Sequence, residues 1–160
     1  MHDDEDQRYS EFLDNMFSEC ISNIITDGGL NAFNIKPMRS LVPENVLLKA
    51  TRLLDNRSIR FCQVIDTDLA FYFIESPTES HIMPADIKWC SCEDYHRLSS
   101  DQNPRSIICP HMLAVFFIKH KLKTHLIPFE EFKETCKSKF SLNLMLQRNN
   151  YEKFDSEKIY

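Results

Sequence analysis

The chain has 160 residues, a formal net charge of −5 and a pI of about 5.7. This length predicts one domain, or one domain with a helical extension, and the acidic balance disfavours strong nucleic-acid binding by the chain alone. No apolar run is long enough to span a membrane, and six cysteines without a secretory signal favour a reducing compartment, either cytosol or nucleus.

Two helices are predicted in the first third of the chain. Apolar residues recur at steps of three and four over 9–25, which is the spacing of one helix face, and the turn residues at 27–29 then end the helix. A second helix is predicted over 43–56, because a proline suits its first turn. Residues 30–41 are predicted as a loop, because Pro37 interrupts regular structure.

The middle of the chain predicts a small antiparallel sheet. Residues 58–75 are rich in β-branched and aromatic side chains around a polar turn at 66–68, so they predict two strands joined as a hairpin. A third strand is predicted over 85–90. The intervening residues 76–83 are predicted as a loop, with His81 as a surface histidine rather than a metal ligand.

The most informative pattern is Cys-x-Cys at 90–92, followed after sixteen residues by Cys-x-His at 109–111. Three thiolates and one imidazole make a complete ligand set for tetrahedral zinc. Side chains two apart in a strand point to the same face, so Cys90 and Cys92 can both reach one ion. Pro110 suits the first position of a helix, which predicts Cys109 at the N-cap and His111 at the second helical position.

Other interpretations of these residues remain open. Cys-x-Cys can be a redox pair or a disulfide of a secreted protein. No secretory signal supports the disulfide, and the spacing of Cys20, Cys62 and Cys136 does not resemble a disulfide framework. His96 lies close enough to compete as a ligand, although His111 fits better because it follows the predicted helix start. We therefore predict one structural Zn²⁺ with four ligands: Cys90, Cys92, Cys109 and His111.

The remainder of the chain predicts two more helices and a tail. Residues 110–121 form a helix that is apolar all round, which either the rest of the chain or a partner protein must cover. A further amphipathic stretch contains Phe129, Phe132, Cys136, Phe140 and Leu144. We predict three regions: an N-terminal helical region at 1–57, a hairpin with zinc finger and C-terminal helix at 58–147, and a flexible tail at 148–160.

The motif resembles the SWIM-type zinc finger, a small ββα module, over residues 85–121. WCSCEDY at 89–95 is similar to the first half of that finger, and CPHMLA at 109–114 is similar to its second half. The wider layout is similar to the SWIM-domain subunit of the Shu complex. The resemblance implies an α+β fold, in which N-terminal helices pack with a small antiparallel sheet and a zinc-bound ββα SWIM finger.

The resemblance also implies a function. SWIM subunits of Shu complexes are not enzymes; they pair with a RecA-like recombinase paralogue and promote recombinase filament assembly during homologous recombination DNA repair in the nucleus. The chain has no Gly-rich phosphate loop, so nucleotide would bind to the partner, and DNA contact would be indirect. The alternative is a stand-alone zinc-dependent nucleic-acid-binding module. A zinc enzyme is disfavoured, because four protein ligands leave no open coordination position.

Overall fold

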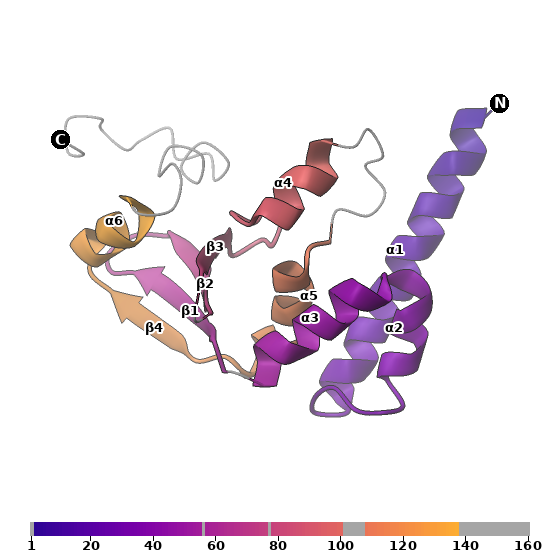
Figure 1. The fold of residues 1–160 in the computed structure, drawn as a ribbon, viewed down its shortest axis with the longest axis horizontal. Coiled ribbons are helices and arrows are strands. Elements are labelled where there is room, and N and C mark those ends of the chain that lie inside the picture. Colours follow the sequence, from indigo (N-terminus) through magenta and orange to yellow (C-terminus); the bar gives the residue numbers. More distant parts are fainter. Residues whose placement is uncertain (1, 56, 77, 101–107, 138–160) are drawn as a thin grey trace.

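The computed structural model describes residues 2–55, 57–76, 78–100 and 108–137. These residues form an α+β fold of six α-helices, one 3₁₀ turn and four strands (Figure 1). In chain order the elements are α1 (His2–Thr26), α2 (Ile35–Leu41), α3 (Glu44–Asp55), β1 (Ile59–Val64), β2 (Ala70–Glu75), β3 (Ser80–Pro84), α4 (Glu93–Ser100), α5 (Pro110–Ile118), η2 (Lys119–Lys121), β4 (Thr124–Ile127) and α6 (Phe129–Lys137). None of the described helices combines the length and apolar character that a membrane span requires.

The N-terminal helix α1 ends where the sequence predicts, although it begins earlier, at His2. The Gly29 N–H donates to the Ile24 carbonyl at 2.8 Å, and the Gly28 N–H donates to the Ile25 carbonyl at 3.0 Å. Gly28 has a φ of +76°, so it supplies the left-handed conformation that this form of helix termination needs. The chain then reverses direction, and α2 packs back against α1.

The loop prediction for residues 30–41 is wrong over its second half, because α2 occupies 35–41. Pro37 lies in the first turn of α2, where a backbone N–H has no intrahelical acceptor and its absence costs little. The connection before α2 is held by Asn34, whose side-chain amide donates to the Asp27 carboxylate at 3.0 Å and to the Gly29 carbonyl at 2.9 Å. The next helix, α3, is confirmed within one residue of its predicted ends.

The predicted hairpin is confirmed, since β1 and β2 pair antiparallel with Cys62 opposite Phe71. The third strand lies earlier than predicted. β3 occupies Ser80–Pro84 and pairs antiparallel with β2, while residues 85–90 form no strand. The reason is a sharp turn at Ile87, whose φ of +58° is incompatible with extended backbone and whose N–H donates to the Pro84 carbonyl at 3.0 Å.

The sheet is mixed rather than antiparallel, because β4 joins it as an unpredicted fourth strand. Its order is β3-β2-β1-β4, and β4 runs parallel to β1 with Phe61 opposite Thr124. Helix α6 follows β4 and confirms the predicted amphipathic stretch, placing Phe132 5.3 Å from Phe71 between ring centroids. Phe140, Leu144 and the predicted tail at 148–160 lie outside the described residues.

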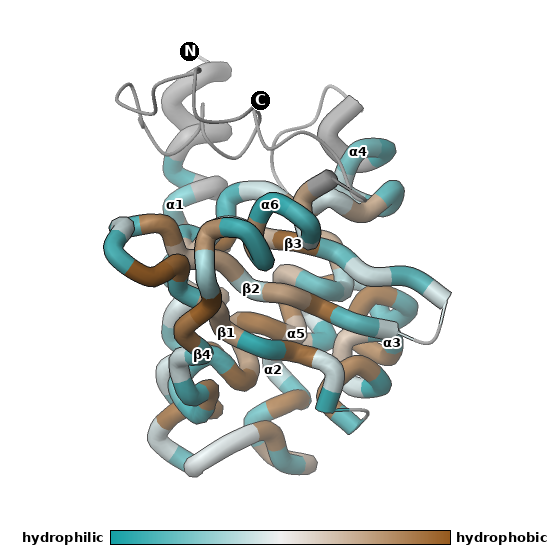
Figure 2. The backbone as a smooth tube through the Cα atoms, turned by 90° about the vertical axis from the view of Figure 1, so that its left-hand side faces the viewer, coloured by the Kyte–Doolittle hydropathy of each residue, from teal (hydrophilic) through white to brown (hydrophobic). Residues whose placement is uncertain are grey.

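Helix α5 lies between the sheet and the N-terminal helices, and the chain itself covers it (Figure 1). Most of its side chains are buried: Pro110, Met112, Leu113, Ala114, Val115 and Phe117. Helix α3 packs along it, and Phe17 of α1 meets Phe116 edge-on with ring centroids 5.3 Å apart. Figure 2 shows the hydrophobic stretches of the strands and α5, which contribute with α1 to a single hydrophobic core.

Candidate metal centre

The structure brings together all four residues that the sequence singles out as zinc ligands. One ligand atom from each residue lies within 4.8 Å of the others: Cys90, Cys92, Cys109 and His111. The three cysteines are at most 3% exposed, so their sulfurs are withdrawn from solvent. His96 is not part of this group; its exposed ring lies near the rings of Trp89 and Tyr95.

The second half of the motif has the predicted local geometry. Cys109 is the N-cap of α5, with φ −79° and ψ 163°, and its Sγ accepts a hydrogen bond from the Met112 N–H at 3.5 Å. Pro110 is the first residue of the helix, which places His111 second. The positive end of the α5 dipole therefore faces the cluster.

The first half of the motif is held differently from the prediction, because Cys90 and Cys92 do not lie on a strand. The residue between them pins their loop to β3: the Ser91 N–H donates to the Ile82 carbonyl at 3.1 Å, and the Ile82 N–H donates to Ser91 Oγ at 3.0 Å. Both cysteines thus reach one point through a loop that is fixed at its middle residue.

Cys92 also precedes a helix, as Cys109 does. Its Sγ accepts a hydrogen bond from the Tyr95 N–H at 3.3 Å, in the position of an N-cap of α4. The Tyr95 hydroxyl donates to the Lys88 carbonyl at 3.1 Å and ties the new helix back to the loop. Two helix N-termini therefore face the cluster, and the acidic pair Glu93 and Asp94 in the first turn of α4 is a sequence signal for the second.

The crowding of three sulfurs perturbs their ionisation strongly. Hydrogen bonds from Cys109 and Cys90 lower the pKa of the Cys92 thiol well below its ordinary range. Hydrogen bonds to Cys109 and Cys92, together with burial, raise the pKa of Cys90 far above it. Thiolates crowded this closely repel one another, and a bound cation would favour deprotonation of all three sulfurs.

His111 completes the donor set. Its Nδ1 is buried and has no hydrogen-bond partner among the described residues. A buried polar atom without a partner is costly unless something else satisfies it, and a metal ion satisfies an imidazole nitrogen directly. Three sulfurs and one imidazole nitrogen fit Zn²⁺, because they are its preferred ligands and match its coordination number of four.

One residue beside the cluster was assigned to the wrong environment. His81 is predicted at the surface, but its side chain is 12% exposed and its ring centroid lies 4.4 Å from that of His111. The misplaced third strand explains the error, since a residue in a surface loop would not approach α5. If residues 80–84 are recognised as a strand, His81 falls on β3. The next residue of that strand, Ile82, anchors the loop of Cys90 and Cys92.

No model of a protein family, no curated protein and no solved structure matches this chain. The resemblance to the SWIM finger therefore depends on the motif residues at 89–95 and 109–114. Within the described part of 85–121 the structure contains α4, α5 and η2 and no strand. An antiparallel pair, β2 and β3, stands directly before the motif.

Proposed function

We propose that this chain is a non-catalytic zinc protein in which Cys90, Cys92, Cys109 and His111 hold one structural Zn²⁺. The observation that carries this proposal is the convergence of four protein donors within 4.8 Å, three of them almost inaccessible to solvent. A catalytic zinc keeps one coordination position open for water or substrate, whereas a closed four-ligand site serves folding. Two helix N-termini complement the net charge of −1 that three thiolates leave on the ion.

We further propose that the chain is the SWIM-type subunit of a Shu-like complex in the nucleus. It would pair there with a RecA-like recombinase paralogue and promote recombinase filament assembly in homologous recombination DNA repair. The resemblance at 89–95 and 109–114 supports this assignment. The ββα order of a SWIM finger would be satisfied if β2 and β3 were its two strands and α5 its helix. The absence of a Gly-rich phosphate loop from the sequence is consistent with a partner that binds the nucleotide.

The buried state of α5 limits where such a partner would bind. Most of its apolar residues are buried within the chain, so α5 offers little apolar surface to a partner. Large apolar side chains are exposed instead at several other places: Phe12, Ile25, Phe33, Leu48, Ile65 and Leu126.

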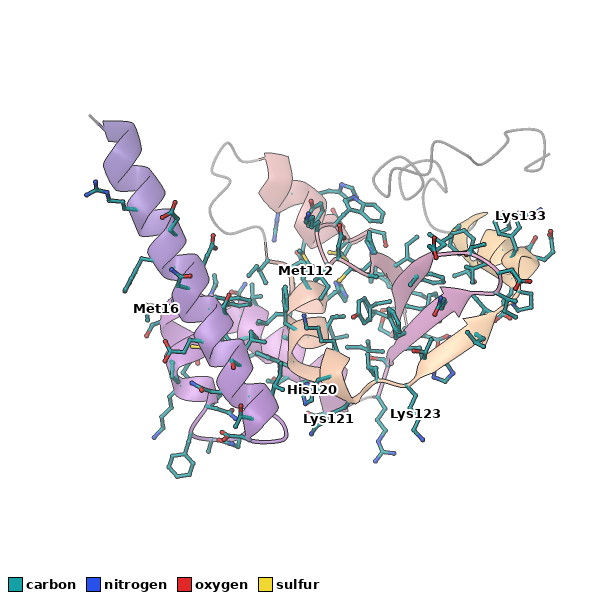
Figure 3. All side chains as sticks on the ribbon, turned by 180° about the vertical axis from the view of Figure 1, so that it is seen from behind. Met16, Met112, His120, Lys121, Lys123 and Lys133 are labelled. Carbon is teal, nitrogen blue, oxygen red and sulfur yellow. The ribbon has the colours of Figure 1, made fainter. Side chains whose placement is uncertain are left out.

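A stand-alone zinc-dependent nucleic-acid-binding module is the second candidate. A run of exposed basic residues after α5 favours it: Lys119, His120, Lys121 and Lys123. Figure 3 shows the labelled members of this run, His120, Lys121 and Lys123, on the same side of the molecule. The net charge of −5 weighs against this candidate, because phosphate binding usually requires a basic surface.

The test compares the wild-type chain with Cys109→Ser, expressed in its native cells and purified with its partners. Serine is a better N-cap than cysteine, so this variant keeps the start of α5 and removes only the sulfur ligand. We expect one zinc per wild-type chain with a stoichiometric RecA-like protein, and loss of both from the variant. Cys20→Ser, a cysteine of α1 outside the cluster, is the control and is expected to retain both.

Two results would contradict the proposal. A wild-type chain without zinc would remove the metal centre and the SWIM assignment together. A chain with one zinc and no RecA-like partner, but with salt-dependent DNA binding of its own, would favour the nucleic-acid-binding module.

A further inference from the structure

The ring of His81 stands directly against the ring of His111. The two centroids are 4.4 Å apart and the rings are tilted by 50°, which is the distance of packed aromatic groups. His81 belongs to β3, whereas His111 belongs to α5, so the contact joins the sheet to the helix that supplies two of the four donors.

A second contact holds His81 in place. Its Nε2 lies 3.1 Å from Oε2 of Glu79, the residue just before β3, within hydrogen-bonding distance. The carboxylate of Glu79 is 69% exposed, whereas the His81 side chain is 12% exposed. A solvent-facing carboxylate thus holds one nitrogen of a largely buried imidazole, whose ring is packed against a candidate metal ligand.

The orientation of His111 needs such a support. The terminal torsion of a histidine side chain is broad, so the ring does not select one direction by itself. Its buried Nδ1 has no hydrogen-bond partner among the described residues that would fix the ring. Metal-binding histidines normally owe their orientation to residues outside the ligand set, and loss of such residues typically weakens metal binding by about 10–100-fold.

We propose that His81 is a positioning residue of the metal centre, which holds the His111 ring in the orientation that presents a nitrogen to the three sulfurs. Glu79 anchors His81, and β3 thereby supports both halves of the motif: His81 orients His111, and Ile82 fixes the loop of Cys90 and Cys92 through Ser91. This inference rests on the zinc site of the proposed function and adds the residues that set its geometry.

The test measures Zn²⁺ affinity by chelator competition, and site geometry by the visible absorption of the Co²⁺-substituted full chain. We expect His81→Ala to weaken Zn²⁺ binding about 10–100-fold and to shift and broaden the Co²⁺ bands. Glu79→Ala should change both in the same direction but by a smaller factor than His81→Ala, because the His81 ring remains and is only less restrained. The controls are His120→Ala and Glu130→Ala, which remove the same side chains at exposed positions outside the cluster.

The absorption of Co²⁺ separates positioning from general support of the fold, because it reports the ligand geometry of molecules that have bound metal. Unchanged affinity and unchanged Co²⁺ bands in both variants would overturn the inference while leaving the zinc site intact. If His81→Ala does not fold with zinc, Glu79→Ala decides by the same criterion, since its exposed side chain contributes little to the core. A wild-type chain that binds no Zn²⁺ would instead overturn the proposed function.

Discussion

The six cysteines occupy two chemically different environments. Three of them converge with His111, and their thiols perturb one another through hydrogen bonds. The other three, Cys20, Cys62 and Cys136, are buried among hydrophobic side chains, and burial raises the pKa of each thiol. Proximity to other donors, rather than burial, is what distinguishes a candidate ligand from a core cysteine in this chain.

Cys136 gives a pH-dependent test of its environment. Burial raises its pKa from 9.0 to about 12, so its protonated form contributes stability that is complete below pH 9 and is lost as the pH rises toward 12. We expect the free energy of unfolding, measured with urea across this window, to fall less steeply with pH in Cys136→Ala than in the wild type. Leu126→Ala, at an exposed position, should keep the wild-type slope. Equal slopes in Cys136→Ala and the wild type would contradict this prediction.

Among the elements, α5 has two roles. Its N-terminus carries Cys109 and His111, and its remaining length forms the centre of the core between the sheet and the other helices. Its lack of a polar face follows from this second role, because α3, α1 and the sheet leave little of it exposed. The position of the candidate ligands is therefore coupled to a helix most of whose side chains are buried.

Two leucine substitutions test how deeply α5 is packed. Leu113 of α5 is fully buried, whereas Leu48 of α3 is 52% exposed. We expect Leu113→Ala to lower the free energy of unfolding by about 2–5 kcal/mol, because it leaves a cavity, and Leu48→Ala by about 0.5 kcal/mol or less. The measurement is urea unfolding of the zinc-loaded chain. Similar losses in the two variants would mean that α5 is not enclosed by the chain.

In the whole molecule, the candidate metal centre joins the sheet to the helical layer. Cys90 and Cys92 lie on a loop pinned to β3, and Cys109 and His111 lie at the start of α5. Residues 85–92 contain neither helix nor strand, so no regular ladder of backbone hydrogen bonds holds them. Metal coordination would therefore supply much of the order in this segment.

Removal of zinc should consequently affect the molecule unevenly. After addition of a chelator, we expect backbone amides of 85–97 and 110–113 to lose protection from hydrogen exchange first. The hairpin of β1 and β2 should retain more protection, because its hydrogen-bonded ladder contains none of the four candidate ligands. Hydrogen exchange with mass spectrometry makes the comparison. Equal loss in β1 and β2 would show that the entire fold depends on the metal, as in isolated zinc fingers.

Helices α1, α3 and α5 and the β1–β2 hairpin could be predicted because their signals are local. The apolar spacing over 9–25, the proline before α3 and the polar turn at 66–68 each act within a few residues. β3 and β4 have only five and four residues, and they become strands through pairing with β2 and β1. Such short segments carry too little periodicity to be recognised before their partners are known.

The candidate ligand set, and the helix start that carries Cys109 and His111, could be recognised from the sequence alone. Sulfur and imidazole chemistry, and the preference of Pro110 for a first turn, do not depend on distant contacts. Two further relations arise when distant parts of the chain pack: Ser91 fixes the loop of Cys90 and Cys92 to β3, and His81 packs on His111. These relations join segments that are separate in the chain, so they exist only once the sheet and α5 have packed together.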